Sequence, residues 1–250
     1  MPTDALSGFV LDGYRSLLVR LRNSGYSSVR LQELRPDEPC MYLRHDIDLS
    51  LEHAAEMARA EAEMGVTSTY FVLLSTDMYN PASARSLALM AEIMDCGHEI
   101  GLHFDATQYP ASDFDAAAGR ECDILSALTG RAVDTISFHR PAPELLNLSR
   151  RFAGRRHTYE PAFFSEIAYI SDSNGGWHRG HPLDHPAIAA RTAIQLLTHP
   201  IWWVGDGERE AVPLIRNFVS ARMRHIDDSV AGTITAYAKW RAGTTEGNPA

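Results

Sequence analysis

The chain has 250 residues, of which 23 are Lys or Arg and 32 are Asp or Glu, so its formal net charge is −9 with neutral histidines. With 45% hydrophobic and 22% charged residues, the composition is typical of a folded globular protein and excludes general disorder. The acidic balance argues against a nucleic-acid or anionic-membrane surface, because such a surface needs clustered basic side chains.

The sequence shows no targeting or membrane-spanning segment. Its start lacks the charged, apolar and small-residue regions of a secretory signal, and no apolar run approaches the roughly 18 residues of a membrane span. Cys40, Cys96 and Cys122 share no CxxC spacing, which indicates isolated thiols rather than a disulfide frame. We therefore expect a cytoplasmic protein with one domain over residues 1–250, including an N-terminal helix over about 5–24 and a loose tail over about 243–250.

Strands and helices alternate along the chain. Apolar and β-branched runs predict strands at residues 41–43, 66–74, 99–103, 133–138, 167–170 and 193–198. Helices between them are expected to begin at caps and to end at glycines, at Ser50 and Gly65, Asn80 and Gly97, and Ser112 and Gly130. A last helical stretch begins near Glu208 and is bent or restarted at Pro213. This alternation implies parallel strands joined by right-handed crossovers, in either an α/β barrel or an open doubly wound sheet.

Polar residues suited to metal binding or catalysis follow the carboxyl ends of several predicted strands. They are Asp46 and Asp48, His103, His139 and Arg140, Asp172, and His199. The carboxyl ends of barrel strands converge on one face, so their number favours a barrel, although a crevice at the switch point of an open sheet stays an alternative.

The residue types point to metal-assisted hydrolysis. One carboxylate and two imidazoles can hold a catalytic Zn²⁺ and leave a position for water. A second carboxylate could then take the proton of that water, and a third imidazole could protonate a departing amine. The alternative for Asp48 is that it competes with Ser50 to cap the next helix, and His98 is more simply read as a structural histidine.

Four motifs in one order resemble the polysaccharide deacetylase family. They are HDID, GHEIGLH, FHRP and LLTHP, and the resemblance covers about Met41 to Trp203. Within the family, the chain is similar to the intracellular branch whose first motif reads RHD[IV]D. The resemblance implies a single distorted (β/α)7-type barrel that hydrolyses N-acyl groups of amino sugars with a divalent metal.

The resemblance also implies roles for individual residues. Asp46 would be the general base, and Asp48 and His103 would be metal ligands. Arg140, followed by proline as in the family's motif, would orient Asp46. His199 would be the general acid that also helps to hold the acyl group.

One position departs from the family pattern. The usual second histidine lies four residues after the first, and Thr107 occupies that position here. We expect His139 to supply the missing ligand because its imidazole suits zinc and it follows an adjacent strand, with Asp105 as the alternative. The expected cofactor is Zn²⁺ or another divalent transition metal.

Further residues are expected around the substrate. Asp172 would support Arg140, or else belong to a turn with Asn174, Gly175 and Gly176. Aromatic and amide side chains that could contact a sugar ring are Tyr79, Asn80, Trp177, Trp202 and Trp203, although tryptophans more often fill a core.

The expected substrate is a small N-acyl amino sugar or a nucleotide-linked precursor, with an acetyl or formyl group, used in the biosynthesis of a surface polysaccharide. One alternative reads Asp46-Ile47-Asp48 as the DxD motif of a sugar-nucleotide transferase that binds Mn²⁺. That alternative leaves the imidazoles unused, since oxygen ligands alone suit a harder metal. Another alternative is a sugar-binding relative without turnover.

Overall fold

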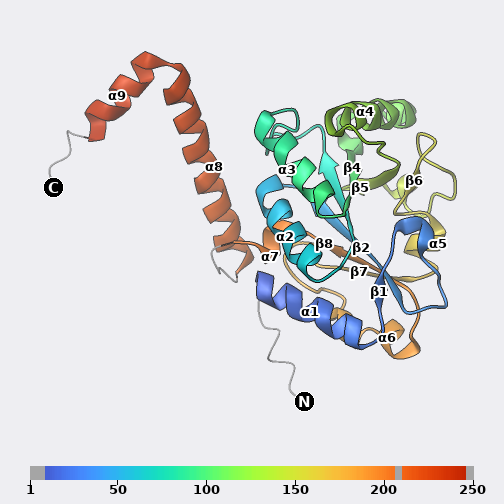
Figure 1. Cartoon of the computed structure of the whole chain (residues 1–250). Coiled ribbons are helices and arrows are strands. Elements are labelled where there is room, and N and C mark those ends of the chain that lie inside the picture. The colour runs from blue at the N-terminus through green and yellow to red at the C-terminus, as the bar shows by residue number, and fades with distance from the viewer. Residues whose placement is uncertain (1–8, 206–209, 246–250) are drawn as a thin grey trace. The chain divides into compact units, whose positions relative to one another are not determined.

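The computed structural model describes residues 9–205 and 210–245, with side chains up to residue 243. Contacts divide the chain into two compact units, Met1–Gly207 and Glu208–Ala250. The first unit holds a sheet with surrounding helices, and the described part of the second is helical (Figure 1). The expectation of one domain over residues 1–250 stays a prediction.

A parallel, curled sheet forms the centre of the first unit. Its order is β6-β5-β4-β3-β2-β8-β7, and β1 also pairs with β2. Every pairing between these strands is parallel, and among the described residues the end strands β6 and β7 do not pair. The sheet is thus a curled half-barrel, which confirms the expected distorted (β/α)7-type α/β fold. The strands are β1 (Ser27–Ser28), β2 (Cys40–Ile47), β3 (Thr69–Leu73), β4 (Glu99–Asp105), β5 (Thr135–His139), β6 (Arg156–His157), β7 (Ala168–Ser171) and β8 (Ile194–Thr198).

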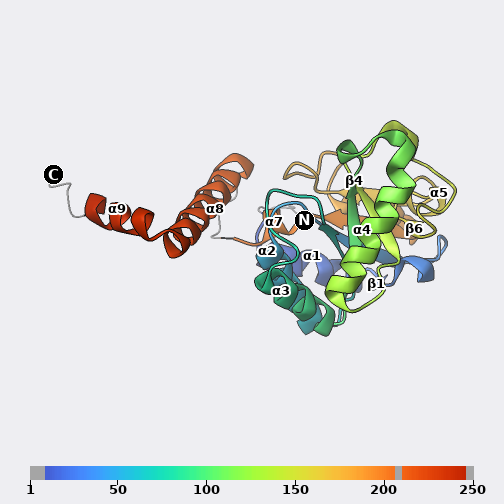
Figure 2. The ribbon, with the colours of Figure 1, turned by 90° about the horizontal axis from the view of Figure 1, so that it is seen from above.

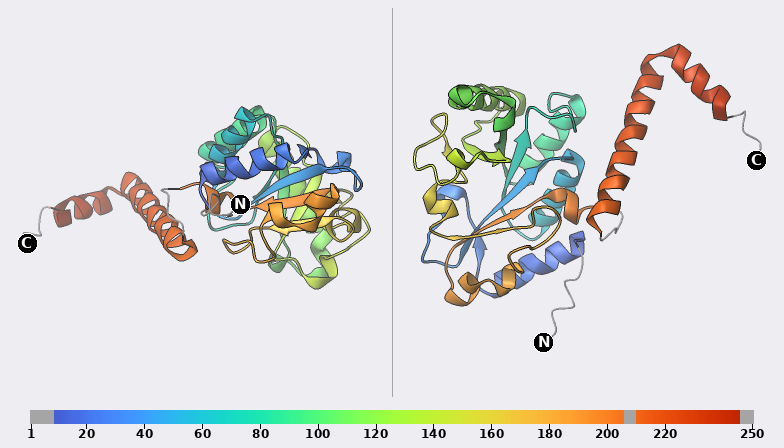
Figure 3. Two further views of the ribbon diagram at one scale, coloured as in Figure 1. Left: turned by 90° about the horizontal axis from the view of Figure 1, so that it is seen from below. Right: turned by 180° about the vertical axis from the view of Figure 1, so that it is seen from behind.

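Helices cover the outside of this sheet. Figures 1 and 2 show α1 to α4 following one another around it, and each contacts the next. Figure 3 shows α1 beside the η6 and α6 segment. The helices of the first unit are α1 (Leu11–Asn23), α2 (Leu51–Glu63), α3 (Ala84–Asp95), α4 (Phe114–Thr129), α5 (Pro161–Phe164), α6 (Pro186–Ala190) and α7 (Pro200–Trp203), with 3-10 turns η2 (Leu31–Glu33), η3 (Ala106–Gln108), η4 (Ala111–Asp113), η5 (Pro143–Leu145) and η6 (Pro182–Asp184).

Two helices begin later than the sequence predicts. The α3 helix is capped by Ser83, whose hydroxyl accepts a hydrogen bond from the backbone of Ser86, because Asn80 already uses its side chain in a turn with Ala82. Likewise Ser112 lies in the turn η4, and α4 begins at Phe114. The N-terminal helix, expected from residue 5, begins at Leu11, and residues 5–8 lie outside the described part.

The second unit contains α8 (Ala211–Thr233) and α9 (Thr235–Thr245). The bend or restart predicted at Pro213 is not found in the described residues, because α8 begins at Ala211 and Pro213 lies in its first turn, where a helix tolerates proline. The helices are instead separated at Ile234, which is extended. Glu208 lies outside the described residues, and helix occupies the start of the tail expected from residue 243.

The central strand β2 is buried along its whole length and presents different side chains to its two faces. Met41 and Leu43 belong to the hydrophobic cluster that includes α1 and α2. Tyr42 packs in another cluster with Phe71 of β3. Because successive side chains of a strand point to opposite faces, Arg44 and Asp46 lie on the side of Tyr42.

The three cysteines are free, as the sequence predicts. Among the described helices, none combines the length and the apolar character needed to cross a membrane.

Candidate active site

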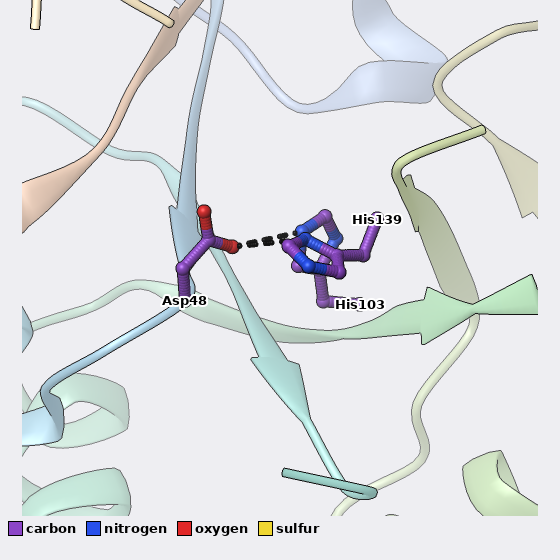
Figure 4. A group of neighbouring side chains, drawn as sticks. All are labelled: Asp48, His103 and His139. Carbon is purple, nitrogen blue, oxygen red and sulfur yellow. Dashed lines mark ion pairs between the residues drawn. The ribbon is translucent and has the colours of Figure 1, made fainter. Parts of the chain in front are cut away.

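Asp48, His103 and His139 meet at the carboxyl ends of β2, β4 and β5 (Figure 4). Oδ1 of Asp48 lies 3.2 Å from Nε2 of His103 and 3.3 Å from Nδ1 of His139. One possible ligand atom from each residue lies within 4.8 Å of the others. The three side chains that the sequence predicts as ligands are therefore close enough to share one ion.

The chemistry of this cluster fits a divalent metal. Oδ1 of Asp48 and Nδ1 of His103 are buried and form no hydrogen bond with the described residues. Burial raises the pKa of Asp48, but the two imidazoles reverse that effect and hold the pKa well below its usual range. A carboxylate with two imidazoles is a donor set that zinc accepts, with a position left for water or substrate. That these residues bind a metal stays a prediction.

Asp46 lies beside the cluster and is almost fully buried. Its Oδ2 accepts a hydrogen bond from Arg44 at 3.0 Å and lies 3.7 Å from Nε2 of His103. The hydroxyl of Ser137 lies 3.3 Å from Oδ1 and 3.4 Å from Oδ2. Oδ1 of Asp46 therefore has fewer polar contacts than Oδ2.

His199 follows β8 and is held by Asp172. Nδ1 of His199 bonds Oδ1 of Asp172 at 2.6 Å, and Nε2 faces Oδ2 of Asp48 at 3.9 Å. Burial alone would lower the pKa of His199, but the charge of Asp172 outweighs it and raises the pKa to about 9. Trp203 donates its indole N–H to the other oxygen of Asp172 at 2.7 Å. Asp172 thus orients His199, and it has no contact with Arg140 among the described residues.

Arg140 does not lie against Asp46. Its guanidinium donates to Oδ2 of Asp105 at 2.5 Å, and its side chain is 62% exposed. Asp105 is also bound by Thr107, through the backbone N–H at 3.1 Å and the hydroxyl at 2.8 Å. Burial raises the pKa of Asp105, and the bonds from Thr107 and Arg140 lower it below its ordinary value. Asp105, the alternative ligand, lies outside the group of side chains close enough to share an ion.

One open cleft of about 620 Å³ is lined by Asp46, Asp48, His103, His139 and His199, together with Asp105 and Arg140. Trp202 is the only one of the predicted sugar-contacting residues in its described lining. Tyr79 is buried and bonds the backbone of Ile47 and Leu73, and Trp177 packs against Trp203. For Tyr79, Asn80, Trp177 and Trp203, substrate binding stays a prediction that the lining of the cleft does not support.

Two side chains at Asp46 were missed by the sequence analysis. Arg44 lies two residues before Asp46, and the two-residue period of a buried strand could have placed both on one face. Ser137 lies opposite His103 in the register of β4 and β5, and only the sheet reveals this pairing.

Comparisons with known proteins give structural likenesses at low identity. No family model matches the sequence, and no curated protein matches it. A family 4 carbohydrate esterase from Bacillus anthracis is 17% identical with a TM-score of 0.45, over 85% of this chain and 86% of that one. The Bc1960 peptidoglycan N-acetylglucosamine deacetylase is 13% identical with a TM-score of 0.45, over 82% and 89%.

The solved structures also include BA3943, a CE4 family pseudoenzyme from Bacillus anthracis. It is 12% identical with a TM-score of 0.40, over 76% of this chain and 63% of that one.

Proposed function

We propose that the chain is a divalent-metal-dependent hydrolase that removes an N-acyl group from an amino sugar or an activated amino-sugar precursor. The observation that carries the proposal is the meeting of three potential ligands, Asp48, His103 and His139, beside a buried carboxylate and an oriented imidazole in one cleft. Metal ligands, a proton acceptor and a proton donor are the groups that amide hydrolysis requires.

Asp48, His103 and His139 would hold the metal. A divalent cation bound there supplies a Lewis acid for the acyl carbonyl and makes a neighbouring water more acidic. Zinc is the ion proposed, because two of the three donors are imidazole nitrogens.

Asp46 and His199 divide the proton transfers between them. Oδ1 of Asp46 accepts the proton of the attacking water, since Oδ2 is already bound to Arg44. Nε2 of His199 donates a proton to the departing nitrogen, because Nδ1 is bound to Asp172. The two residues approach from β2 and β8, which are neighbours in the sheet.

The DxD transferase alternative receives no support from this geometry. Oδ2 of Asp46 is bound to a guanidinium, and Oδ1 of Asp48 faces two imidazoles. These two residues therefore do not form the pair of free carboxylates that would bind Mn²⁺ and a diphosphate.

The experiment is metal analysis of protein purified without chelator, followed by measurement of acetate or formate release. The panel is N-acetylglucosamine, its oligomers, its nucleoside-diphosphate derivative, and the corresponding N-formyl sugars. We expect bound zinc and acid release from at least one of them. An Asp46→Asn variant should keep its metal and lose about 10²- to 10⁴-fold in turnover, the usual contribution of a general base. Nearly full turnover of the metal-loaded variant would refute the role of Asp46.

A further inference from the structure

Arg44 is a charged side chain buried in the middle of the sheet, and in the reaction described above it neither binds the metal nor transfers a proton. It lies on β2 between β3 and β8, and its exposed fraction is 0%. Because Arg44 and Asp46 are two residues apart on a strand, both side chains project from the same face, and the guanidinium lies beneath the carboxylate.

Hydrogen bonds hold both terminal nitrogens of the Arg44 guanidinium and one oxygen of Asp46. One terminal nitrogen of Arg44 donates to Oδ2 of Asp46 at 3.0 Å and to the hydroxyl of Tyr159 at 3.3 Å. The other donates to Oε1 of Gln195 at 3.2 Å and to the hydroxyl of Thr158. A planar guanidinium with donors used in two directions has little freedom to rotate.

Aromatic rings enclose the same group. The guanidinium carbon lies 5.1 Å from the ring centre of Tyr159, 5.8 Å from that of Phe71 and 5.9 Å from that of Tyr169. Arginine over aromatic faces is a favourable arrangement, and here it excludes water from the cation. The cation is thus held in place independently of Asp46.

Arg140, the arginine that the family resemblance assigns to Asp46, is engaged elsewhere. It binds Asp105, is mostly exposed, and has a φ of 47°, which directs its chain away from the preceding strand. Among the described residues, Arg44 is the cation in contact with Asp46.

We propose that Arg44 is the positioning residue for Asp46: its hydrogen bond to Oδ2 turns the carboxylate so that Oδ1 is presented to the reacting water. This inference rests on the proposed function, because it assumes that Asp46 is the general base. Arg44 does not touch the substrate. A buried arginine could instead serve only to join β2, β8 and the segment around Thr158, and the experiment separates these roles.

The test is a double-mutant cycle with Arg44→Lys and Asp46→Asn in the metal-loaded protein, using the sugar of the panel that releases most acid. Lysine keeps the charge but cannot make the same fork of hydrogen bonds. We expect Arg44→Lys to lower kcat by about 10²-fold, the cost of a small misplacement of a reacting group, with an unchanged KM and metal content. In the Asp46→Asn background, Arg44→Lys should cause no further loss.

A control for general loss of stability is Glu61 of α2, which contacts His45 on the opposite face of β2. Glu61→Gln disturbs a buried carboxylate that contacts His45 and not Asp46, and we expect it to keep its kcat. If Arg44→Lys keeps the wild-type kcat, or lowers it by the same factor in both backgrounds, the inference is overturned.

Crystal structures of the wild-type protein and of Arg44→Lys provide a readout that needs no activity. We expect a single orientation of the Asp46 carboxylate in the wild type. In the variant we expect the carboxylate to be rotated or to occupy two orientations. An unmoved carboxylate contradicts the inference even if no sugar of the panel is hydrolysed. Absence of acid release from the wild type contradicts the proposed function alone.

Discussion

The direction of the His139 side chain decides whether a second imidazole reaches Asp48. His139 is the last residue of β5, and Arg140 after it adopts a left-handed backbone conformation. The two side chains consequently diverge, since His139 contacts Asp48 while Arg140 binds Asp105. A single turn of the backbone thus separates a candidate metal ligand from an ion pair between an exposed arginine and a buried aspartate.

Replacing His139 tests its role as a ligand. We expect His139→Ala to lose tightly bound metal while the fold is kept, because the side chain is partly exposed and two ligands bind zinc weakly. The measurement is metal content per chain, together with the thermal unfolding midpoint. His178→Ala, which removes an exposed histidine outside the cluster, should keep its metal. An unchanged metal content in His139→Ala would exclude His139 as a ligand.

At the scale of single elements, β2 serves the site on one face and the packing of helices on the other. His45, between Arg44 and Asp46, points to the helical side, where Nε2 bonds Oε1 of Glu61 at 2.8 Å. Glu61 of α2 is fully buried and also accepts hydrogen bonds from other elements. These donors are the hydroxyls of Tyr14 in α1, Ser68 before β3 and Tyr70 in β3. Glu61 therefore joins α1 and α2 to the strands that carry the site.

Glu61→Gln tests this connection. The amide has the size of the carboxylate but cannot accept all of these bonds, so buried donors are left unpaired. We expect a loss of about 1–3 kcal/mol in the free energy of unfolding, measured with urea.

Glu63→Gln in the same helix is the matched control. Glu63 is exposed and pairs with Arg15 at 3.0 Å on the surface. Surface pairs contribute less than about 1 kcal/mol, so the change should be smaller. Equal losses in the two variants would mean that the buried network adds nothing specific.

At the scale of the whole molecule, we expect the buried His98 to make the stability of the protein depend on pH. Burial lowers the pKa of His98 below 6.5, although the charge of Glu61 opposes this effect. Nδ1 of His98 accepts from the backbone N–H of Ser68 at 3.2 Å, and Nε2 lies 3.0 Å from the carbonyl oxygen of Ala58. Protonation would place a second donor against the N–H of Ser68. These contacts agree with the structural interpretation of His98.

The sign of the pH effect follows from this shift. In the unfolded chain His98 takes up a proton near pH 6.5, whereas in the folded chain it does so only at a lower pH. Its contribution is present above that range and is lost as the pH falls toward the folded-state pKa. We expect His98→Gln to be less stable at about pH 8 and to lose less of its stability at about pH 5 than the wild type. Urea unfolding at both pH values measures this, and a parallel decline in both proteins would contradict it.

Because the chain divides into two compact units, we expect the site residues to come from the first unit alone. Every residue placed at the site and in the three hydrophobic clusters precedes Gly207. We expect a chain of residues 1–207 to keep the metal content and the unfolding midpoint of the full chain. A shorter chain that also lacks β8 should fail to fold. Loss of metal from the 1–207 chain, with its unfolding midpoint unchanged, would contradict this prediction.

Much of the fold could be predicted from local patterns. The apolar runs located the main strands, and Ser50 caps α2 as expected, with its hydroxyl accepting from His53 at 3.3 Å. Helix starts at Asn80 and Ser112 were wrong because the Asn80 side chain forms a turn with Ala82 and Ser112 lies in the 3-10 turn η4. The separation of α8 and α9 at Ile234, two residues after Gly232, was not predicted.

By itself the sequence determined the order of strands and helices and the residue types at each strand end, since periodicity and capping act over a few residues. It also placed Asp48, His103 and His139 in the same group, because parallel strands bring their carboxyl ends together. Only the tertiary structure decided which arginine meets Asp46 and which carboxylate holds His199. The two-residue period of a strand could have paired Arg44 with Asp46, but the left-handed turn at Arg140 and the register of β7 with β8 leave no local pattern in the sequence.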